Sequence, residues 1–256
     1  MCLDNTKLNS RAIEELQKFS EADISDFRDA PETDEEILNR IGDAQGVILS
    51  WRTQLGEEIL QKCPDLKYIG LACSLYDDES SNVAVKFAQK NGVEVTGIFD
   101  YGDPGVVEFI TSELIRLLHG FGKQQWKEDP VELTNRKIGI VGLGTTGQML
   151  AECLLPFNAN LYYYSRTRKP GWEQKGLKYL ELPELLKTTE ILSFHLPKNT
   201  SLMGTEEFNL FGKGKILINT SLGLPFEESA FQDWIKKEGN FAIFDGDGGE
   251  IGRAHV

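Results

Sequence analysis

The chain has 256 residues, enough for two domains or one large one, and 40% of them are hydrophobic and 26% charged. Acidic residues outnumber basic residues by 40 to 27, which gives a formal net charge of −13. Binding to a nucleic-acid backbone requires clustered Lys and Arg, so this balance argues against a DNA or RNA partner.

The sequence shows no membrane-spanning or export pattern. No apolar run approaches the roughly 18 residues that a bilayer span needs, and the opening MCLDNTKLNSRAIEEL lacks the basic and then apolar pattern of a signal peptide. The four cysteines form no C-x-x-C pair and no zinc-type spacing with His: Cys2, Cys63, Cys73 and Cys153. We therefore expect a cytoplasmic protein with reduced thiols, no membrane partner and no metal.

The first hundred residues alternate helical and strand patterns. Helical periodicity is present in three segments: 11–19, 34–41 and 80–92. Apolar runs typical of buried strands occur in three others: 46–51, 66–73 and 93–98. This alternation predicts a small α/β domain over 1–101, because the Gly, Asp and Pro of the loop from Asp100 to Gly105 mark its end.

The remaining chain begins with a long apolar helix over 104–121, and from Lys137 strand and helix patterns alternate again. The expected strands are 137–142, 160–165, 190–196, 215–221 and 241–246. The expected helices are 146–155, 182–187, 206–211 and 226–237. Repeated β-α-β units with mostly apolar strands predict a parallel sheet covered on both faces, in a second domain over 102–249.

The segment KIGIVGLGTTGQMLAECLL, which begins at Lys137, contains a G-x-G-x-x-G turn between a strand and a helix. In such a turn Gly142 permits the tight bend, Gly144 lets the backbone approach a pyrophosphate, and Gly147 allows close packing of helix on strand. The free N–H groups at the start of the helix face the phosphate. The sequence therefore predicts a dinucleotide-binding domain.

The residues after the second strand of that domain predict which dinucleotide it binds. About 20 residues beyond the glycines, a carboxylate usually accepts hydrogen bonds from the adenosine ribose. Here that position is Ser165, followed by Arg166, Thr167, Arg168 and Lys169. A hydroxyl beside a guanidinium offers charge-assisted hydrogen bonds to a 2′-phosphate, which a carboxylate would repel. We therefore favour NADP(H) over NAD(H); NAD or dual use is the alternative, since an isolated SRTRK string is ordinarily a solvated basic turn.

Four ordered segments resemble the D-isomer-specific 2-hydroxyacid dehydrogenases, a family that includes glyoxylate and hydroxypyruvate reductases. They are LKYIG with the later GVEVT, the helix PGVVEFITSELIRLL, the glycine turn, and the pair ILSFHLPKNTSL and KILINTSLG ending in IFDGD. The resemblance covers nearly the whole chain. It implies an α/β fold, with a Rossmann-type doubly wound parallel sheet in 102–249 and a smaller flavodoxin-like α/β substrate domain in 1–101, both incomplete.

The resemblance also implies hydride transfer between NADP(H) and a small 2-keto or 2-hydroxy acid, in a homodimer formed through the cofactor domain. Carried over by position, it puts the backbone of Thr145 and Thr146 on the pyrophosphate. It puts the other residues on the rest of the cofactor: His195, Leu196 and Pro197 along it, Thr220 and Ser221 near the nicotinamide ribose, and Asp245 on the carboxamide. Because His195 lies in a strand-end S-x-H-x-P motif, we assign it to binding and not to proton transfer; a buried structural histidine is the alternative.

The substrate pocket departs from the family pattern. Reduction of a 2-keto acid needs a cation for the carboxylate and an acid for the forming alkoxide. The family's Arg belongs in an N-T-x-R-G segment, where this chain has Leu222, and the loop ACSLYDDESSN has Cys73 and Leu75 where glycines are usual. Arg52, at the end of a predicted strand, is a candidate replacement cation, although a solvated surface Arg is the commoner outcome.

The two ends of the chain bear on this prediction. The resemblance places the catalytic His beyond IFDGD, so we expect a C-terminally truncated chain without hydride transfer, and only the last residues of the family's first strand at the start. The final EIGRAHV resembles a translated sequencing adaptor, so 250–256 is expected to be a non-native tail, with a short natural tail as the alternative. Glu250 falls where the family's catalytic Glu would lie, and we assign it no role; His255 is not a substitute for the missing His.

A second hypothesis, from a different class, is a dinucleotide-binding regulator or scaffold that has kept the cofactor site and lost the chemistry. Leu222 and the altered ACSLYDD loop motivate it. The absence of the family's catalytic His from the full-length protein would favour it, whereas normal turnover of a keto acid with NADPH by this chain would contradict the account of missing catalytic groups.

Overall fold

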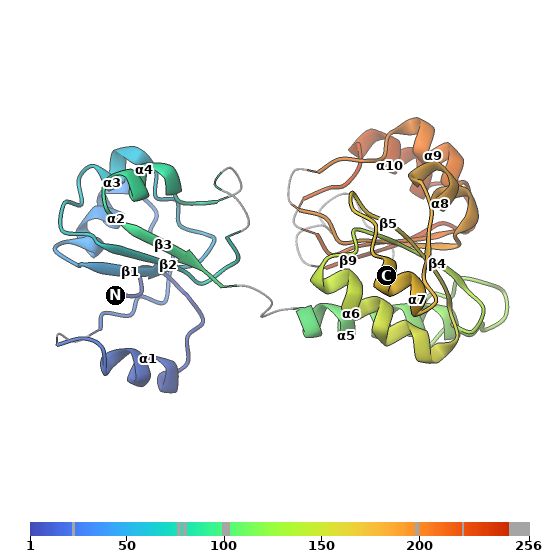
Figure 1. Cartoon of the computed structure of the whole chain (residues 1–256), viewed down its shortest axis with the longest axis horizontal. Coiled ribbons are helices and arrows are strands. Elements are labelled where there is room, and N and C mark those ends of the chain that lie inside the picture. Colours follow the sequence, from blue (N-terminus) through green and yellow to red (C-terminus); the bar gives the residue numbers. More distant parts are fainter. Residues whose placement is uncertain are drawn as a thin grey trace. The chain divides into compact units, whose positions relative to one another are not determined.

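The computed structural model describes the chain in segments: 1–21, 24–75, 78, 81–98, 103–197, 200–221 and 223–245. The chain divides into two compact units, Met1–Phe99 and Asp100–Val256. Each unit has a parallel sheet of its own (Figure 1). The roles expected for the two ranges, substrate binding for 1–101 and dinucleotide binding for 102–249, stay predictions.

The sheet of the first unit consists of β1 (Gly46–Leu49), β2 (Tyr68–Leu71) and β3 (Glu94–Gly97), paired in parallel in that order. Cys2 extends this sheet, because it forms parallel bridges to Ile48 on one side and to Asp26 on the other. The order across the sheet is therefore Asp26, Cys2, β1, β2, β3, which is the 2-1-3-4-5 order of flavodoxin-like folds. The predicted flavodoxin-like arrangement is confirmed.

The helices of the first unit are α1 (Ser10–Gln17), α2 (Asp34–Ile41), α3 (Glu57–Leu60) and α4 (Val85–Lys90). Asn9 and Thr33 cap the first two, each accepting a hydrogen bond from an N–H of the first turn. The helices α2, α3 and α4 bury apolar side chains in the core of the unit. By contrast α1 lies on the other side of the sheet and buries none of its residues (Figure 1).

The sheet of the second unit has the parallel order β6-β5-β4-β7-β8-β9. Its strands are β4 (Lys137–Val141), β5 (Asn160–Tyr164), β6 (Lys178–Tyr179), β7 (Ile191–Phe194), β8 (Ile216–Asn219) and β9 (Phe241–Phe244). Counted from β4, this is the 3-2-1-4-5-6 order of a Rossmann fold. The order reverses between β4 and β7, and the crevice at such a switch point is where doubly wound folds bind ligands.

Helices cover both faces of this sheet (Figure 1). On one face lie α5 (Asp103–His119) and α6 (Thr145–Leu154), and on the other α8 (Leu182–Thr188), α9 (Thr205–Phe211) and α10 (Glu228–Ile235). The first face has an aliphatic core around α5 and α6, whereas the second has an aromatic core that includes Phe208, Phe231 and Trp234. The doubly wound sheet predicted from apolar β-α-β units is therefore confirmed.

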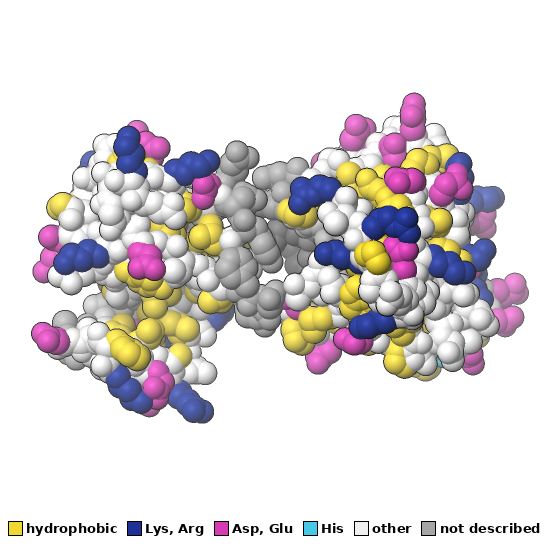
Figure 2. Space-filling model, viewed as in Figure 1, with side chains coloured by type: hydrophobic (Ala, Val, Ile, Leu, Met, Phe, Trp, Pro, Cys, Tyr) yellow, Lys and Arg dark blue, Asp and Glu magenta, His cyan; other side chains and the backbone are white. Residues whose placement is uncertain are grey.

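The sequence patterns did not predict four short elements: α3, α7 (Pro170–Gln174), β6 and the 3-10 turn η1 (Leu155–Phe157). The helical ones span five residues or fewer, which is too short for a helical period to repeat, and β6 spans two residues. Within the described segments, no helix is long and apolar enough to cross a membrane. On the face shown in Figure 2, acidic and basic side chains are interspersed on each unit.

Candidate dinucleotide-binding site

The glycine turn lies at the switch point of the second sheet, directly after β4. Gly142 has φ +93°, a conformation that L side chains rarely adopt, and a Cβ there would overlap the carbonyl oxygen of His195 after β7. The Gly142 N–H donates to the Tyr164 carbonyl at 2.8 Å, and the His195 N–H donates to the Val141 carbonyl at 2.8 Å. Gly142 therefore lies where the ends of β4, β5 and β7 meet, and only glycine fits at this position.

The other two glycines of the turn have different requirements. A Cβ on Gly147 would overlap the Gly142 carbonyl oxygen, so the close packing of α6 on the strand end demands glycine there. A Cβ on Gly144 would meet no atom within 4 Å. The fold itself does not need a glycine at position 144, and the missing side chain leaves open space for a ligand to approach the backbone.

The start of α6 presents unfilled hydrogen-bond donors at this open side. The N–H groups of Thr145, Thr146 and Gly147 have no acceptor among the described residues, and the Gln148 N–H is the first to bond, to the Gly144 carbonyl at 2.9 Å. Such N–H groups and the helix dipole favour a bound phosphate. The Thr146 hydroxyl donates to Asp103 on α5, so Thr146 has its backbone, and not its side chain, free for an anion.

The basic turn after β5 contains one arginine without a partner and one that is paired. Arg166 is exposed and forms no hydrogen bond or ion pair with a described residue. Arg168 donates to Glu173 through Nε at 3.1 Å and Nη2 at 2.5 Å. Ser165 donates its hydroxyl to the Thr167 carbonyl at 2.6 Å, which closes the turn. No acidic residue occurs from 160 to 172, so the carboxylate usual for the ribose is missing from this strand end.

His195 follows β7 and lies beside the glycine turn. Its Nε2 is 2.9 Å from the hydroxyl of the fully buried Ser193, and burial lowers the pKa of His195 to about 4. The ring is therefore neutral at physiological pH. Ser193 was not among the predicted site residues, although its i, i+2 spacing from His195 places both on the same face of the strand.

Ser221 connects the carboxyl ends of β7 and β8. Its hydroxyl accepts a hydrogen bond from the Leu196 N–H at 2.9 Å and donates to the Phe194 carbonyl at 3.4 Å, while its N–H donates to Asn219 at 3.2 Å. The hydroxyl of Ser221 is thus engaged within the protein, so Ser221 shapes this edge.

Three other residues of the predicted site lie at the same carboxyl edge. Thr220 directly follows β8 and is partly exposed, and Pro197 is exposed. Asp245 follows β9; its side chain is exposed, and its N–H donates to the Asn219 carbonyl at 3.4 Å. Leu222 and Glu250 lie outside the described residues.

The candidate cation Arg52 belongs to the first unit, on the loop after β1. Its guanidinium lies 4.8 Å from the ring centroid of Trp51, and Trp51 is 55% exposed. The backbone of this loop is held by Asp4, which accepts hydrogen bonds from the Ser50 N–H at 2.7 Å and from the Thr53 hydroxyl at 2.6 Å. The loop therefore presents Arg52 on an ordered backbone, without an ionic partner among the described residues.

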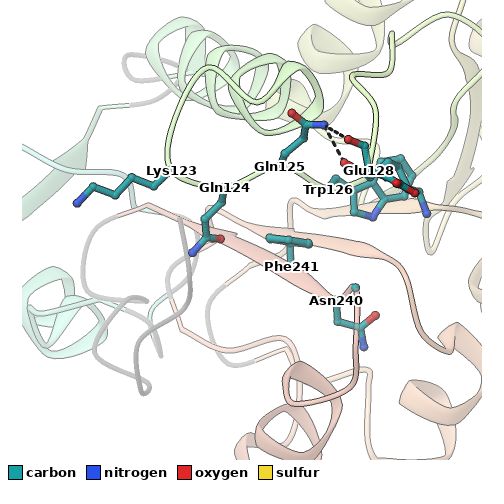
Figure 3. A pocket seen from close by; sticks show the side chains of 9 residues that line it. Lys123, Gln124, Gln125, Trp126, Glu128, Asn240 and Phe241 are labelled. Atoms are coloured by element: carbon teal, nitrogen blue, oxygen red, sulfur yellow. Dashed lines mark hydrogen bonds between the residues drawn. The ribbon is translucent and has the colours of Figure 1, made fainter.

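A hollow in the second unit lies away from this edge. It is lined by the segment after α5, including Lys123 and Trp126, and by Asn240 and Phe241 at the start of β9 (Figure 3). Gln125 closes part of its rim by donating to two backbone carbonyls at 2.8 Å. Because strands of a parallel sheet start at the edge opposite the one where they end, this hollow is not the crevice at the glycine turn.

The fold and the glycine turn define a dinucleotide-binding protein, and comparison with known proteins narrows this class to the nicotinamide-dependent oxidoreductases. Residues 111–246 match the family model of the D-isomer specific 2-hydroxyacid dehydrogenase, NAD binding domain. The chain belongs to this family, whose members use a nicotinamide dinucleotide to interconvert 2-hydroxy and 2-keto acids. The resemblance found in the sequence is confirmed.

Relatives and solved structures match over most of the chain. A hydroxypyruvate reductase of Blautia hydrogenotrophica is 25% identical over 87% of this chain and 72% of its own length, and a glyoxylate reductase of Thermococcus litoralis is 28% identical over 90% and 75%. The TT0316 protein from Thermus thermophilus superposes with TM-score 0.82 at 22% identity, covering 95% of this chain and 81% of its own. An acyclic imino acid reductase in complex with NADPH and D-Arg gives 0.78 at 24%, over 96% and 82%. At these identities the structures show the fold alone.

Proposed function

We propose that this chain represents an NADP(H)-dependent oxidoreductase that transfers a hydride between the nicotinamide and a small 2-keto or 2-hydroxy acid. We further propose that the chain itself does not complete this transfer, because no residue in it is assigned as the proton donor for the forming alkoxide. Family membership supports the reaction class, and the relatives named for glyoxylate and hydroxypyruvate support a small substrate. The choice of NADP(H) rests on one observation: the strand end that would carry an acid in an NAD site has Arg166, which no described residue pairs, beside Ser165.

At the phosphate end of the cofactor, the backbone of Thr145 and Thr146 binds the pyrophosphate, because these donors have no acceptor within the described segments and Gly144 leaves the approach open. Ser165, Arg166 and Thr167 receive the 2′-phosphate of NADP(H). The guanidinium of Arg166 supplies the positive charge, and it does so without first breaking an ion pair to any residue that the structure describes.

At the nicotinamide end, the carboxyl edge of β7, β8 and β9 supplies His195, Leu196, Pro197, Thr220, Ser221 and Asp245. The bound nicotinamide supplies or accepts the hydride. His195 is neutral and hydrogen-bonded to Ser193, which suits it for packing along the cofactor and not for giving a proton at pH 7. Arg52 is the proposed cation for the substrate carboxylate, since Leu222 cannot supply one.

A titration of the wild-type chain and of Arg166→Met with NADPH and with NADH tests the cofactor assignment. Loss of a charge-assisted hydrogen bond should weaken NADPH binding about 10-fold to 100-fold and leave NADH binding within about 2-fold. Arg116→Met is the matched control, because Arg116 is paired with Glu113 on α5, and it should change neither affinity. Tighter binding of NADH than of NADPH by the wild type would overturn the proposal.

A second candidate function, binding of the dinucleotide without turnover, is favoured by Leu222 at the family's arginine position. It separates from the first by activity and not by affinity. Both functions predict NADPH binding, but only the first predicts oxidation of NADPH, when glyoxylate or hydroxypyruvate is added, by a protein that carries the family's catalytic His.

A further inference from the structure

The basic turn after β5 is held by a network of side chains that do not belong to it. Tyr163 on β5 is fully buried, and its hydroxyl accepts a hydrogen bond from the Lys169 N–H at 2.7 Å. The same hydroxyl donates to Glu173 Oε1 on α7 at 2.9 Å. Tyr163 therefore connects the last backbone N–H of the turn to the carboxylate that binds Arg168.

The carboxylate of Glu173 neutralises the charge of one of the two arginines, Arg168. Arg168 binds both of its oxygens, and the guanidinium also lies 5.0 Å from the Tyr179 ring centroid. Two N–H groups on one carboxylate and a ring below fix the guanidinium in position and orientation. The charge of Arg168 is thus neutralised inside the protein, on the α7 side of the turn.

The protonation states of Glu173 and Tyr163 favour these hydrogen bonds. Hydrogen bonds from Arg168 and then Tyr163 hold the pKa of the Glu173 carboxyl below its usual value, so it is ionised at neutral pH. Burial raises the pKa of Tyr163, so its hydroxyl keeps the proton that it donates to Glu173. Both roles of Tyr163, acceptor from Lys169 and donor to Glu173, are therefore available together.

The alternation of β5 explains why Tyr163 reaches this position. The residues on either side, Tyr162 and Tyr164, are partly exposed, whereas Tyr163 points into the core and is packed edge-on to Tyr179 at 5.4 Å. Three successive tyrosines thus differ in role because successive side chains of a strand point to opposite faces.

We propose that Tyr163 and Glu173 are positioning residues for recognition of the 2′-phosphate: they engage Arg168 and fix the turn from Ser165 to Lys169, so that Arg166 is the cation presented to the phosphate. The inference rests on the proposed NADP(H) function, since it concerns the same turn. It assigns different roles to two arginines that stand two residues apart in the sequence and are chemically identical.

The substitution Tyr163→Phe tests this inference, because it removes the hydroxyl and keeps the buried ring. Without its acceptor, the Lys169 N–H no longer anchors the turn, and NADPH binding should weaken about 5-fold to 10-fold while NADH binding stays within about 2-fold. Tyr179→Phe is the matched control: the Tyr179 hydroxyl donates to Glu181 at 2.9 Å and not to the turn, and its ring remains beneath Arg168. The control should change neither affinity.

The ratio of the two affinities separates positioning from loss of structure. Equal weakening of NADPH and NADH, or no change in either, would overturn the inference while leaving the Arg166 result intact. A wild type that prefers NADH would instead overturn the proposed function itself. If Tyr163→Phe unfolds, Arg168→Lys takes its place: it keeps the charge but loses the paired contact with Glu173, and it should weaken NADPH binding alone. An unchanged NADPH affinity in a folded Arg168→Lys would contradict the inference.

Discussion

Each unit has a parallel sheet whose strand order reverses once. At the carboxyl edge of each sheet, beside this switch point, the hydrogen-bond donors of the chain are in different states. In the first unit the reversal lies between Cys2 and β1, and there Asp4 accepts hydrogen bonds from the Ser50 N–H, the Ser50 hydroxyl and the Thr53 hydroxyl. In the second unit it lies between β4 and β7, and there the N–H groups at the start of α6 have no acceptor in the described part of the chain. At the first edge a carboxylate of the chain occupies three donors, whereas at the second the donors at the start of α6 have no acceptor among the described residues.

This difference shows that a reversal of strand order does not by itself make a ligand site. The topology opens a crevice at both edges, but the residue after the strand decides whether the backbone or a side chain can meet a ligand. Asp4 occupies the Ser50 N–H and the Thr53 hydroxyl, so these donors of the loop after β1 are not open to a ligand, and the same loop carries Arg52 with its guanidinium against the Trp51 ring. The glycines after β4 carry no side chain that could fill the donors of α6, so the backbone itself remains available.

The largest expected effect comes from Gly142→Ala. The new Cβ would overlap the His195 carbonyl oxygen at a positive φ, so we expect the second unit to lose about 4 kcal/mol of stability. Hydrogen exchange measured separately over the two units should show faster opening in the second unit only. Equal changes in both units would contradict the division drawn above.

Gly144→Ala is the matched control for that substitution. Its Cβ meets no atom within 4 Å and its φ is −82°, so the stability of the second unit should change by less than about 1 kcal/mol. NADPH binding should nevertheless weaken, because the methyl group enters the open side of the turn. The two variants therefore separate what the fold needs from what the ligand needs.

The features that define the candidate site of the second unit could be predicted from the sequence because they are local. The glycine turn, the absent acid after β5 and the apolar strands all lie in continuous segments of sequence. Which of the two arginines, Arg166 or Arg168, is paired with a carboxylate could not be predicted. The pairing depends on Glu173 and Tyr163, which come together only when α7 packs against β5. The engagement of Asp4 with Ser50 likewise joins residues 46 positions apart.

The next largest effect is a change in the free energy of unfolding with pH. It tests whether His195, at the carboxyl edge of the second unit's sheet, is held neutral. The pKa of His195 is lowered from 6.5 to about 4 by burial, so the unfolded chain binds a proton more readily than the folded unit does. The stability that the neutral ring contributes is therefore present above pH 6.5 and lost as the pH falls toward 4, by about 3 kcal/mol. The difference in unfolding free energy between the wild type and His195→Gln should follow this course. A difference independent of pH would show that His195 is not held neutral.

The smallest of the three effects concerns the first edge. In Asp4→Ala the three donors of Ser50 and Thr53 lose their acceptor, and we expect the first unit to lose about 2 kcal/mol, since water entering the vacated space can satisfy part of the demand. Asp43→Ala, at an exposed position of the same unit, is the control and should change stability by less than about 0.5 kcal/mol. The loss should appear in hydrogen exchange of the loop after β1 and leave NADPH affinity unchanged, because the dinucleotide is assigned to the other edge. If Asp4→Ala weakened NADPH binding as strongly as Arg166→Met, the two edges would not act independently, and the assignment of the cofactor to the second unit alone would have to be abandoned.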